Sequence, residues 1–298
     1  MIIISWNTTR KCNQFCAHCY RDAGPDASEH ELTTDEGFKL LDDIKKAGFR
    51  IMVLSGGEPL VRPDMLDLVK HGADIGLRVV LGTNGTLLTP EWIENLKEAG
   101  CARVGISLDS CEASIHDEFR RMPGAWETTV NAMNDCKRLG MPFQMHTTVT
   151  ERNYDEIVRM TDLAVELGAA AHHVFFLVPT GRGTDIEQET IKASQYEKLL
   201  NDICKKQQEV DIELKPTCAP HFMRIAKRRE IPMRFTKGCL AGTHYCVITP
   251  DGDVHPCPYL PIKVGNVHDK PFDEIWDTAP LFHELREADL KGDRKSVV

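Results

Sequence analysis

The chain has 298 residues, of which 42% are hydrophobic and 27% are charged, so it can bury a full core and has the composition of a globular protein. Its formal net charge of -9 disfavours nucleic acid as a general partner. The apolar start, Met1 to Trp6, is too short for a signal peptide or a membrane span, and no later stretch is long enough. We therefore expect a cytoplasmic protein with neither a nucleic-acid nor a membrane partner.

Short apolar runs alternate with amphipathic helical stretches from the start of the chain to about Thr184. This alternation is typical of βα units with a parallel sheet. The expected strands are Ile2–Trp6, Ile51–Leu54, Arg78–Leu81, Arg103–Leu108, Gln144–Val149 and His173–Val178. Six units predict an α/β fold, a partial (β/α)6 TIM-like barrel over residues 1–184, followed by a second region over 185–298.

Helix signals fall between these strands. Thr33 with Glu36 forms a capping-box pattern, and Thr89 followed by Pro90 is a typical helix start. Glycines stand where the helices should end, at Gly48, Gly76, Gly100, Gly140 and Gly168. Beyond Thr184 we expect a helix over Ser194–Gln208 and a strand near Ile212–Lys215.

Three cysteines follow the first strand at the spacing Cys12-x3-Cys16-x2-Cys19. Four thiolates would complete an iron–sulfur cluster, whereas three leave one iron open to a small molecule. Zinc sites usually have four ligands in paired Cys-x2-Cys units, and disulfides are disfavoured without a secretory signal. A set of structural thiols is the simpler alternative. The scattered cysteines are interpreted as buried thiols: Cys101, Cys111, Cys136 and Cys204.

Unusual residues also follow the other expected strands. Singly, they are typical of tight turns, helix caps or a core histidine. Together they predict one site, because the carboxyl ends of parallel strands share one face of a barrel. They are Gly56, Gly57 and Glu58 after the second strand, Thr83 and Asn84 after the third, Ser107 and Asp109 at the fourth, His146 on the fifth and Arg182 after the sixth.

The cysteine spacing followed by Gly-Gly-Glu-Pro on a partial βα barrel resembles the radical S-adenosylmethionine (SAM) enzymes, over roughly Ile2 to Gly183. The resemblance implies a [4Fe–4S] cluster on the three cysteines, with SAM on the open iron. It implies that Gly56 and Gly57 allow the backbone to approach the SAM ammonium, and that Glu58 adds a negative charge near it.

The same resemblance implies that Ser107 and Arg120 bind the SAM carboxylate. The spacing between this serine and arginine is one residue longer than in the family, so Arg121 remains an alternative. Thr83, Asn84, Asp109, His146 and Arg182 complete the set of expected cofactor-binding residues. No catalytic residue is assigned beyond the cluster and SAM.

Four later cysteines resemble the opening of the SPASM/twitch extension, which holds auxiliary iron–sulfur clusters: Cys218, Cys239, Cys246 and Cys257. Asp251-Gly252 predicts a hairpin that brings Cys246 and Cys257 near each other. A hairpin with free thiols is the alternative. No cysteine follows Cys257, so the extension is either truncated or altered, and we expect one auxiliary [4Fe–4S] cluster rather than two.

Several segments resemble the tetrapyrrole-processing members, the AhbD-like haem synthases and the NirJ-like proteins of haem d1 formation. They are Ser5 to Thr9, Cys19 to Gly24, Val178 to Gly183 and Cys218 to Arg224. This resemblance implies oxidative decarboxylation of Fe-coproporphyrin III to haem b, with a low-potential flavodoxin or ferredoxin as electron donor. Residues expected to bind the substrate carboxylates are Arg224, Lys227 and Arg228.

Three alternatives stay open at this point. One is a NirJ-like step on another tetrapyrrole side chain. Another is a SPASM-type peptide maturase, which is disfavoured because the first strand begins at Ile2 and leaves no room for a peptide-binding domain. The third is a non-catalytic iron–sulfur electron-transfer protein, which would leave Gly56, Gly57, Glu58 and Arg120 unexplained.

Overall fold

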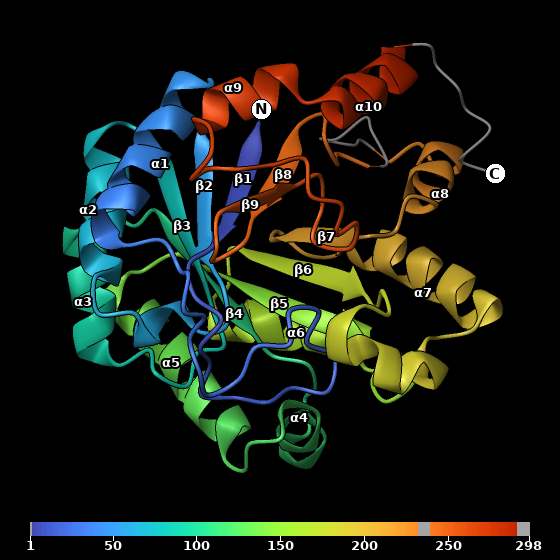
Figure 1. The fold of residues 1–298 in the computed structure, drawn as a ribbon. Helices are drawn as coiled ribbons and strands as arrows, with labels where there is room; N and C mark the ends of the chain where they lie inside the picture. The colour runs from blue at the N-terminus through green and yellow to red at the C-terminus, as the bar shows by residue number, and fades with distance from the viewer. Residues whose placement is uncertain (1, 232–238, 291–298) are drawn as a thin grey trace.

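The computed structural model describes residues 2–231 and 239–290. Ten strands of the described chain form one sheet, in the order β10-β9-β8-β1-β2-β3-β4-β5-β6-β7 (Figure 1). The strands are β1 (Ile3–Asn7), β2 (Ile51–Ser55), β3 (Arg78–Thr83), β4 (Arg103–Ser107), β5 (Phe143–Val149), β6 (Ala171–Phe176), β7 (Glu213–Thr217), β8 (Tyr245–Ile248), β9 (Asp253–His255) and β10 (Gly265–Asn266).

Helices follow most strands and cover the outer face of the curved sheet. They are α1 (Thr34–Lys46), η1 (Pro59–Val61), α2 (Met65–Asp74), α3 (Pro90–Glu98), α4 (Ala113–Arg120), α5 (Ala125–Leu139), α6 (Ile157–Leu167), η2 (Gly181–Glu189), α7 (Ala193–Lys206), α8 (Phe222–Arg228), α9 (Phe272–Thr278) and α10 (Pro280–Leu290). None of the described helices is long and apolar enough to cross a membrane.

The predicted βα alternation is confirmed, and strands β1 to β7 pair in parallel in chain order. The capping box of α1 is present, since the Thr33 amide donates to the Glu36 carboxylate at 2.8 Å. Thr89 accepts from the Trp92 amide at the start of α3. All five glycines expected at helix ends have positive φ values. Alternate strand residues such as Ile4 and Met52 point into the core between sheet and helices.

The structure departs from the predicted boundary at residue 184 in two ways. Helix α7 and strand β7 continue the pattern, and β7 pairs in parallel with β6, so a seventh parallel strand extends the expected six. Strand β8 pairs in parallel with β1, with Ile3 opposite Tyr245. The sheet therefore runs across the boundary, and the division into 1–184 and 185–298 stays a proposal about how the chain is organised.

The predicted hairpin is present at the edge of the sheet. Strands β8 and β9 are antiparallel, with Val247 opposite His255. Gly252 has a φ of +81° in the turn between them, a conformation that side-chain-bearing residues rarely adopt. The hairpin thus lies beside β1 as a part of the barrel wall.

Candidate iron–sulfur and SAM site

The first three cysteines lie on a loop after β1 that is held at several points. The Cys12 amide donates to Gly24 O at 2.6 Å, and the Ala17 amide donates to Phe119 O at 3.0 Å. Cys16 is buried, whereas Cys12 and Cys19 are half-buried. Burial, followed by the nearby Glu58 carboxylate and the other two thiols, raises the pKa of Cys12 to about 12. Burial also raises the pKa of Cys16, so a cation that binds to these neighbouring thiols displaces protons from Cys12 and Cys16.

A buried ion pair stands behind this loop. Nε of Arg120, at the end of α4, donates to Oδ2 of Asp109 at 2.6 Å, and its Nη1 donates to Sγ of Cys16 at 3.8 Å. The Thr148 amide on β5 donates to the other oxygen of Asp109 at 2.9 Å. Burial opposes ionisation of Asp109, but the guanidinium of Arg120 holds the pKa of Asp109 below its usual value. Arg120 is thereby fixed with its positive charge beside Cys16.

The Gly-Gly-Glu segment packs directly on the cysteine loop. A Cβ on Gly57 would lie 2.2 Å from Lys11 O, and a Cβ on Gly56 would lie 2.6 Å from Thr9 O. The amides of Gly57 and Glu58 donate to the carbonyls of Thr9 and Lys11 at 2.7 and 2.9 Å. The absence of side chains at these glycines allows the two backbones to meet, which is a contact the sequence prediction did not include.

Glu58 is fully buried and accepts three hydrogen bonds. Its donors are the Leu60 amide at 3.1 Å, the Thr83 hydroxyl at 2.8 Å and the Asn84 amide at 2.8 Å. Burial raises the pKa of Glu58 to about 7, although these donors oppose the rise. Asn84 also donates to the side chain of Asn13 on the cysteine loop at 2.8 Å. Glu58, Thr83 and Asn84 thus connect the ends of β2 and β3 to the loop.

Polar side chains line the inner face of strands β4 to β6. Ser107, His146 and His173 are opposite one another in register. The rings of His146 and His173 are stacked with centroids 5.5 Å apart, and burial lowers the pKa of His146 to about 4. Gly105 accommodates the imidazole of His146, since a Cβ there would lie 2.6 Å from the ring. The Ser107 hydroxyl has no hydrogen-bond partner in the described chain, so it is available to a ligand.

A second group of thiols forms from Cys218 after β7, Cys239, and Cys257 after β9. The surrounding protein atoms, then the thiols of Cys257 and Cys239, raise the pKa of Cys218 to about 12. An aromatic contact joins this group to the first one. The rings of Tyr20, next to Cys19, and Tyr259, whose amide donates to Cys257 Sγ at 3.5 Å, have centroids 5.5 Å apart.

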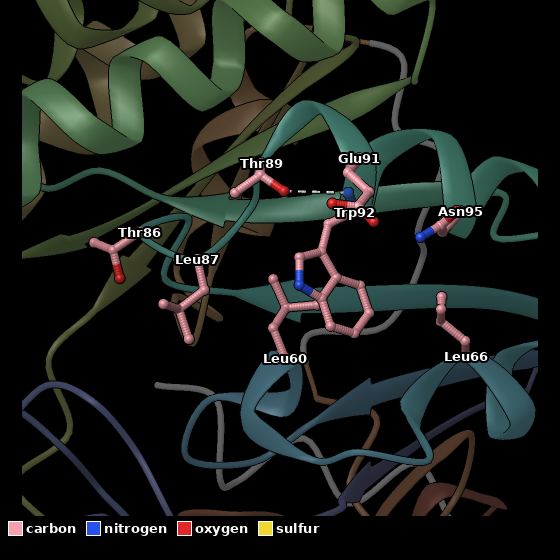
Figure 2. A pocket seen from close by; sticks show the side chains of 8 residues that line it. All are labelled: Leu60, Leu66, Thr86, Leu87, Thr89, Glu91, Trp92 and Asn95. Carbon is pink, nitrogen blue, oxygen red and sulfur yellow. Dashed lines mark hydrogen bonds between the residues drawn. The ribbon is translucent and has the colours of Figure 1, made fainter.

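A surface pocket of about 580 Å³ lies between η1, α2 and α3, with Leu60, Leu87 and Trp92 in its wall (Figure 2). Thr86 connects it to the cysteine loop by accepting from the side chain of Asn13 at 2.8 Å. None of the predicted site residues lines this pocket. It is therefore separate from the thiols and from the inner face of the sheet.

Two family models match the chain. The model described as "Radical SAM superfamily" matches residues 6–164, and the one described as "Iron-sulfur cluster-binding domain" matches residues 239–296. The chain belongs to the radical SAM superfamily. The predictions of the fold class, of the family and of its SAM and iron–sulfur cofactors are confirmed.

Curated relatives are similar over most of this radical SAM chain. The AdoMet-dependent heme synthase of Methanosarcina barkeri is 45% identical over 303 residues, covering 97% of this chain and 86% of that protein. The enzyme of the same name from Nitratidesulfovibrio vulgaris is 38% identical, covering 95% and 81%. Streptococcus suis SuiB bound to S-adenosylmethionine superposes with a TM-score of 0.76 at 17% identity, covering 96% of this chain and 67% of that one. The SuiB similarity shows the fold alone.

The residues present fit the cofactors of the radical SAM family. In the described residues no three His, Cys, Asp or Glu side chains converge as ligands of a single metal ion. A [4Fe–4S] cluster does not require such convergence, because each cysteine binds a different iron. Three thiols next to the buried cation of Arg120 therefore suit a cluster better than zinc, and the unpartnered Ser107 hydroxyl suits the SAM carboxylate.

Not all residues predicted to bind cofactors lie in this arrangement. Arg182 donates from Nε to Cys16 O at 3.0 Å and from Nη1 to Ala23 O at 2.7 Å. It holds the outside of the cysteine loop instead of facing the inner strands. Arg121 is exposed, whereas Arg120 is buried at the ion pair. The structure thus favours Arg120 over the alternative at position 121.

Cys246 lies apart from the other three cysteines predicted to hold the auxiliary cluster. It lies on β8 with no exposed surface and belongs to the hydrophobic core, where burial raises the pKa of its thiol and Arg286 is its charged neighbour. Tyr245, the residue before Cys246 on β8, lies near Cys257. Because adjacent strand residues point to opposite faces, Cys246 points away from Cys257. The structure therefore brings three of the four predicted auxiliary cysteines together and leaves Cys246 in the core.

The predicted substrate residues lie on α8. Arg224 is half-buried and forms an ion pair with Glu197 of α7, whereas Lys227 and Arg228 are exposed at the end of the helix. Sequence reasoning missed His18, whose ring stacks on Phe119 with centroids 4.2 Å apart. Its position between Cys16 and Cys19 in the sequence is the feature from which its place beside the thiols could have been predicted.

Proposed function

We propose that this protein converts two propionates of Fe-coproporphyrin III to vinyl groups and so forms haem b. The observation that carries the proposal is the 45% identity to an AdoMet-dependent heme synthase over nearly the whole chain. For each propionate, the reaction removes one hydrogen atom, releases CO2 and leaves one electron to be transferred to an acceptor. The two thiol groups on one chain match these two requirements, radical generation and electron removal.

The first thiol group and the inner strands supply the radical half of the chemistry. When bound, a reduced [4Fe–4S] cluster together with SAM would supply one-electron reductive cleavage and hydrogen-atom abstraction. Cys12, Cys16 and Cys19 would hold this cluster. The Ser107 hydroxyl would donate a hydrogen bond to the SAM carboxylate, and the buried Arg120 fixes a positive charge on the same side of the loop.

The second thiol group would hold an auxiliary [4Fe–4S] cluster. The nearness of the Cys218, Cys239 and Cys257 thiols to one another supports these three as its ligands. Such a cluster supplies a one-electron acceptor next to the barrel. We also propose that a low-potential flavodoxin or ferredoxin delivers the electron that starts each turnover.

The test is anaerobic incubation of the reconstituted protein with SAM, dithionite and Fe-coproporphyrin III. We expect haem b, two CO2 per haem and 5′-deoxyadenosine, measured by mass spectrometry and absorbance. Cys16→Ala should abolish 5′-deoxyadenosine. Cys257→Ala should retain its formation but lose haem b. Formation of 5′-deoxyadenosine without loss of CO2 from this porphyrin would reject the decarboxylase proposal, and modification of another tetrapyrrole would favour the NirJ-like alternative.

A further inference from the structure

An exposed aromatic side chain lies on the outside of the cysteine loop. Phe15 directly precedes the buried Cys16, yet 46% of its surface is exposed. It is one of few large hydrophobic side chains that the described surface exposes to this extent. Aromatic residues are costly to expose and are enriched at protein interfaces. This position places Phe15 at a point of close access to the first thiol group.

Two positive charges lie near this ring. The guanidinium carbons of Arg182 and Arg121 lie 3.9 and 5.6 Å from the Phe15 centroid. The backbone of Lys11 forms an isolated parallel β-bridge with Gly24. A Cβ placed on Gly24 would lie 3.8 Å from the Phe15 ring. Lys11 and Arg121 are exposed.

Arg10, the next residue along the loop, is also exposed and donates from Nε to a backbone carbonyl, Asp22 O, at 3.4 Å. Among the described residues, none of the side chains of Arg10, Lys11 and Arg121 forms an ion pair with a carboxylate. We name the surface made by Arg10, Lys11, Phe15 and Arg121 the Phe15 face. Its positive charge stands out in a chain whose formal net charge is -9.

The backbone at Arg121 also sets this face apart. Arg121 ends α4 with a φ of +52° and a ψ of +41°, the left-handed conformation that glycine usually supplies at helix ends. An arginine there is strained, and strained residues concentrate at functional sites. The conformation directs the arginine side chain over Phe15.

We propose that the Phe15 face docks a small acidic protein that carries one electron at low potential and passes it to the cluster on the first three cysteines. The carrier loses one electron and the cluster gains one, with no bond made or broken. Acidic partners are steered to a basic face by charge, and aromatic and arginine side chains are enriched at the centres of interfaces. This inference rests on the proposed radical SAM function, because only that chemistry requires the electron.

The test compares a protein donor with a chemical one. Reduced flavodoxin or dithionite is supplied in separate reactions with SAM, and the initial rate of 5′-deoxyadenosine formation is measured. The variants are Phe15→Ala and Arg121→Asn, since asparagine tolerates the left-handed conformation and keeps the helix end. Matched controls on outer helices are Val165→Ala, which removes an exposed apolar side chain, and Arg138→Asn, which removes an exposed arginine.

We expect about a tenfold lower rate with flavodoxin at low ionic strength for Phe15→Ala combined with Arg121→Asn, and a smaller difference at high salt. The rate with dithionite should be unchanged, as should both rates in the controls. Calorimetry with oxidised flavodoxin should show weaker binding to the double variant. An equal loss with both donors, or no loss with flavodoxin, would overturn the docking face. Absence of 5′-deoxyadenosine from the unmodified protein with dithionite would instead reject the proposed function.

Discussion

Replacing Gly57 by alanine tests what the Gly-Gly-Glu segment does. The new Cβ would lie 2.2 Å from Lys11 O and 2.7 Å from Arg10 O, both of them backbone atoms, whereas ordinary contact begins at 3.4 Å. The cysteine loop would have to move by about 1.2 Å. That movement breaks the hydrogen bonds from the Gly57 and Glu58 amides, at about 1 kcal/mol each, and adds about 1–3 kcal/mol of overpacking. The total cost is about 3–5 kcal/mol.

The assay separates contact with the loop from contact with SAM. We expect Gly57→Ala to lower the free energy of unfolding of the apoprotein in urea, and to lower the iron and sulfide bound after reconstitution. The matched control is Gly183→Ala, which also faces the cysteine loop but whose Cβ would lie 3.6 Å from its nearest atom, His18 O. Unchanged unfolding and full iron content, with loss of SAM binding alone, would refute the reasoning and restore the SAM contact predicted from the sequence.

Three further predictions follow from buried groups. His172 bonds to Thr hydroxyls through both ring nitrogens, and burial lowers its pKa to about 3, so the unfolded state binds more protons below pH 6.5. Relative to His172→Gln, the protein should therefore lose about 1.4 kcal/mol of unfolding free energy per pH unit as pH falls from 6 to 4, measured by urea unfolding. If the unfolding free energies of the two proteins changed in parallel with pH, this prediction would be contradicted. Cys246→Ala should keep the auxiliary-cluster Mössbauer signal that Cys218→Ala loses, and equal losses would return Cys246 to the ligand set. Arg120→Ala should destabilise the apoprotein by about 3–5 kcal/mol because Asp109 stays buried without its partner, whereas a loss below about 1 kcal/mol would argue against the ion pair.

The sequence predicted those features that depend on neighbouring residues. The capping box at Thr33 and the start of α3 at Thr89 are local patterns, and both are present. The gathering of motifs at strand ends also follows from local information, since parallel strands place their carboxyl ends together. Glu58, Asn84 and Ser107 therefore lie near the loop or on the inner face as expected, although Glu58 proves to be surrounded by protein donors.

Pairing between distant segments could not be predicted. Strand β8 has four residues and pairs with β1 across more than two hundred residues of chain, and no local pattern specifies that partner. The orientation of Cys246 depends on this pairing, because the strand's register decides which face each side chain joins. The contacts of Arg182 could not be predicted for a similar reason. Its loop was placed correctly after β6, but only the folded structure shows the guanidinium on Cys16 O.

The pairing of β8 with β1 also explains how the two thiol groups come to share one aromatic contact. It places the half-buried Tyr245 of β8 beside Tyr20 and Cys257. Tyr20 extends the loop that begins with Cys12, and Tyr259 extends the segment that carries Cys257. Because the strand that anchors the second segment is also part of the barrel wall, a change that detaches β8 would disturb both groups together. The cysteine-rich extension is thus a structural component of the barrel as well as a site for its own thiols.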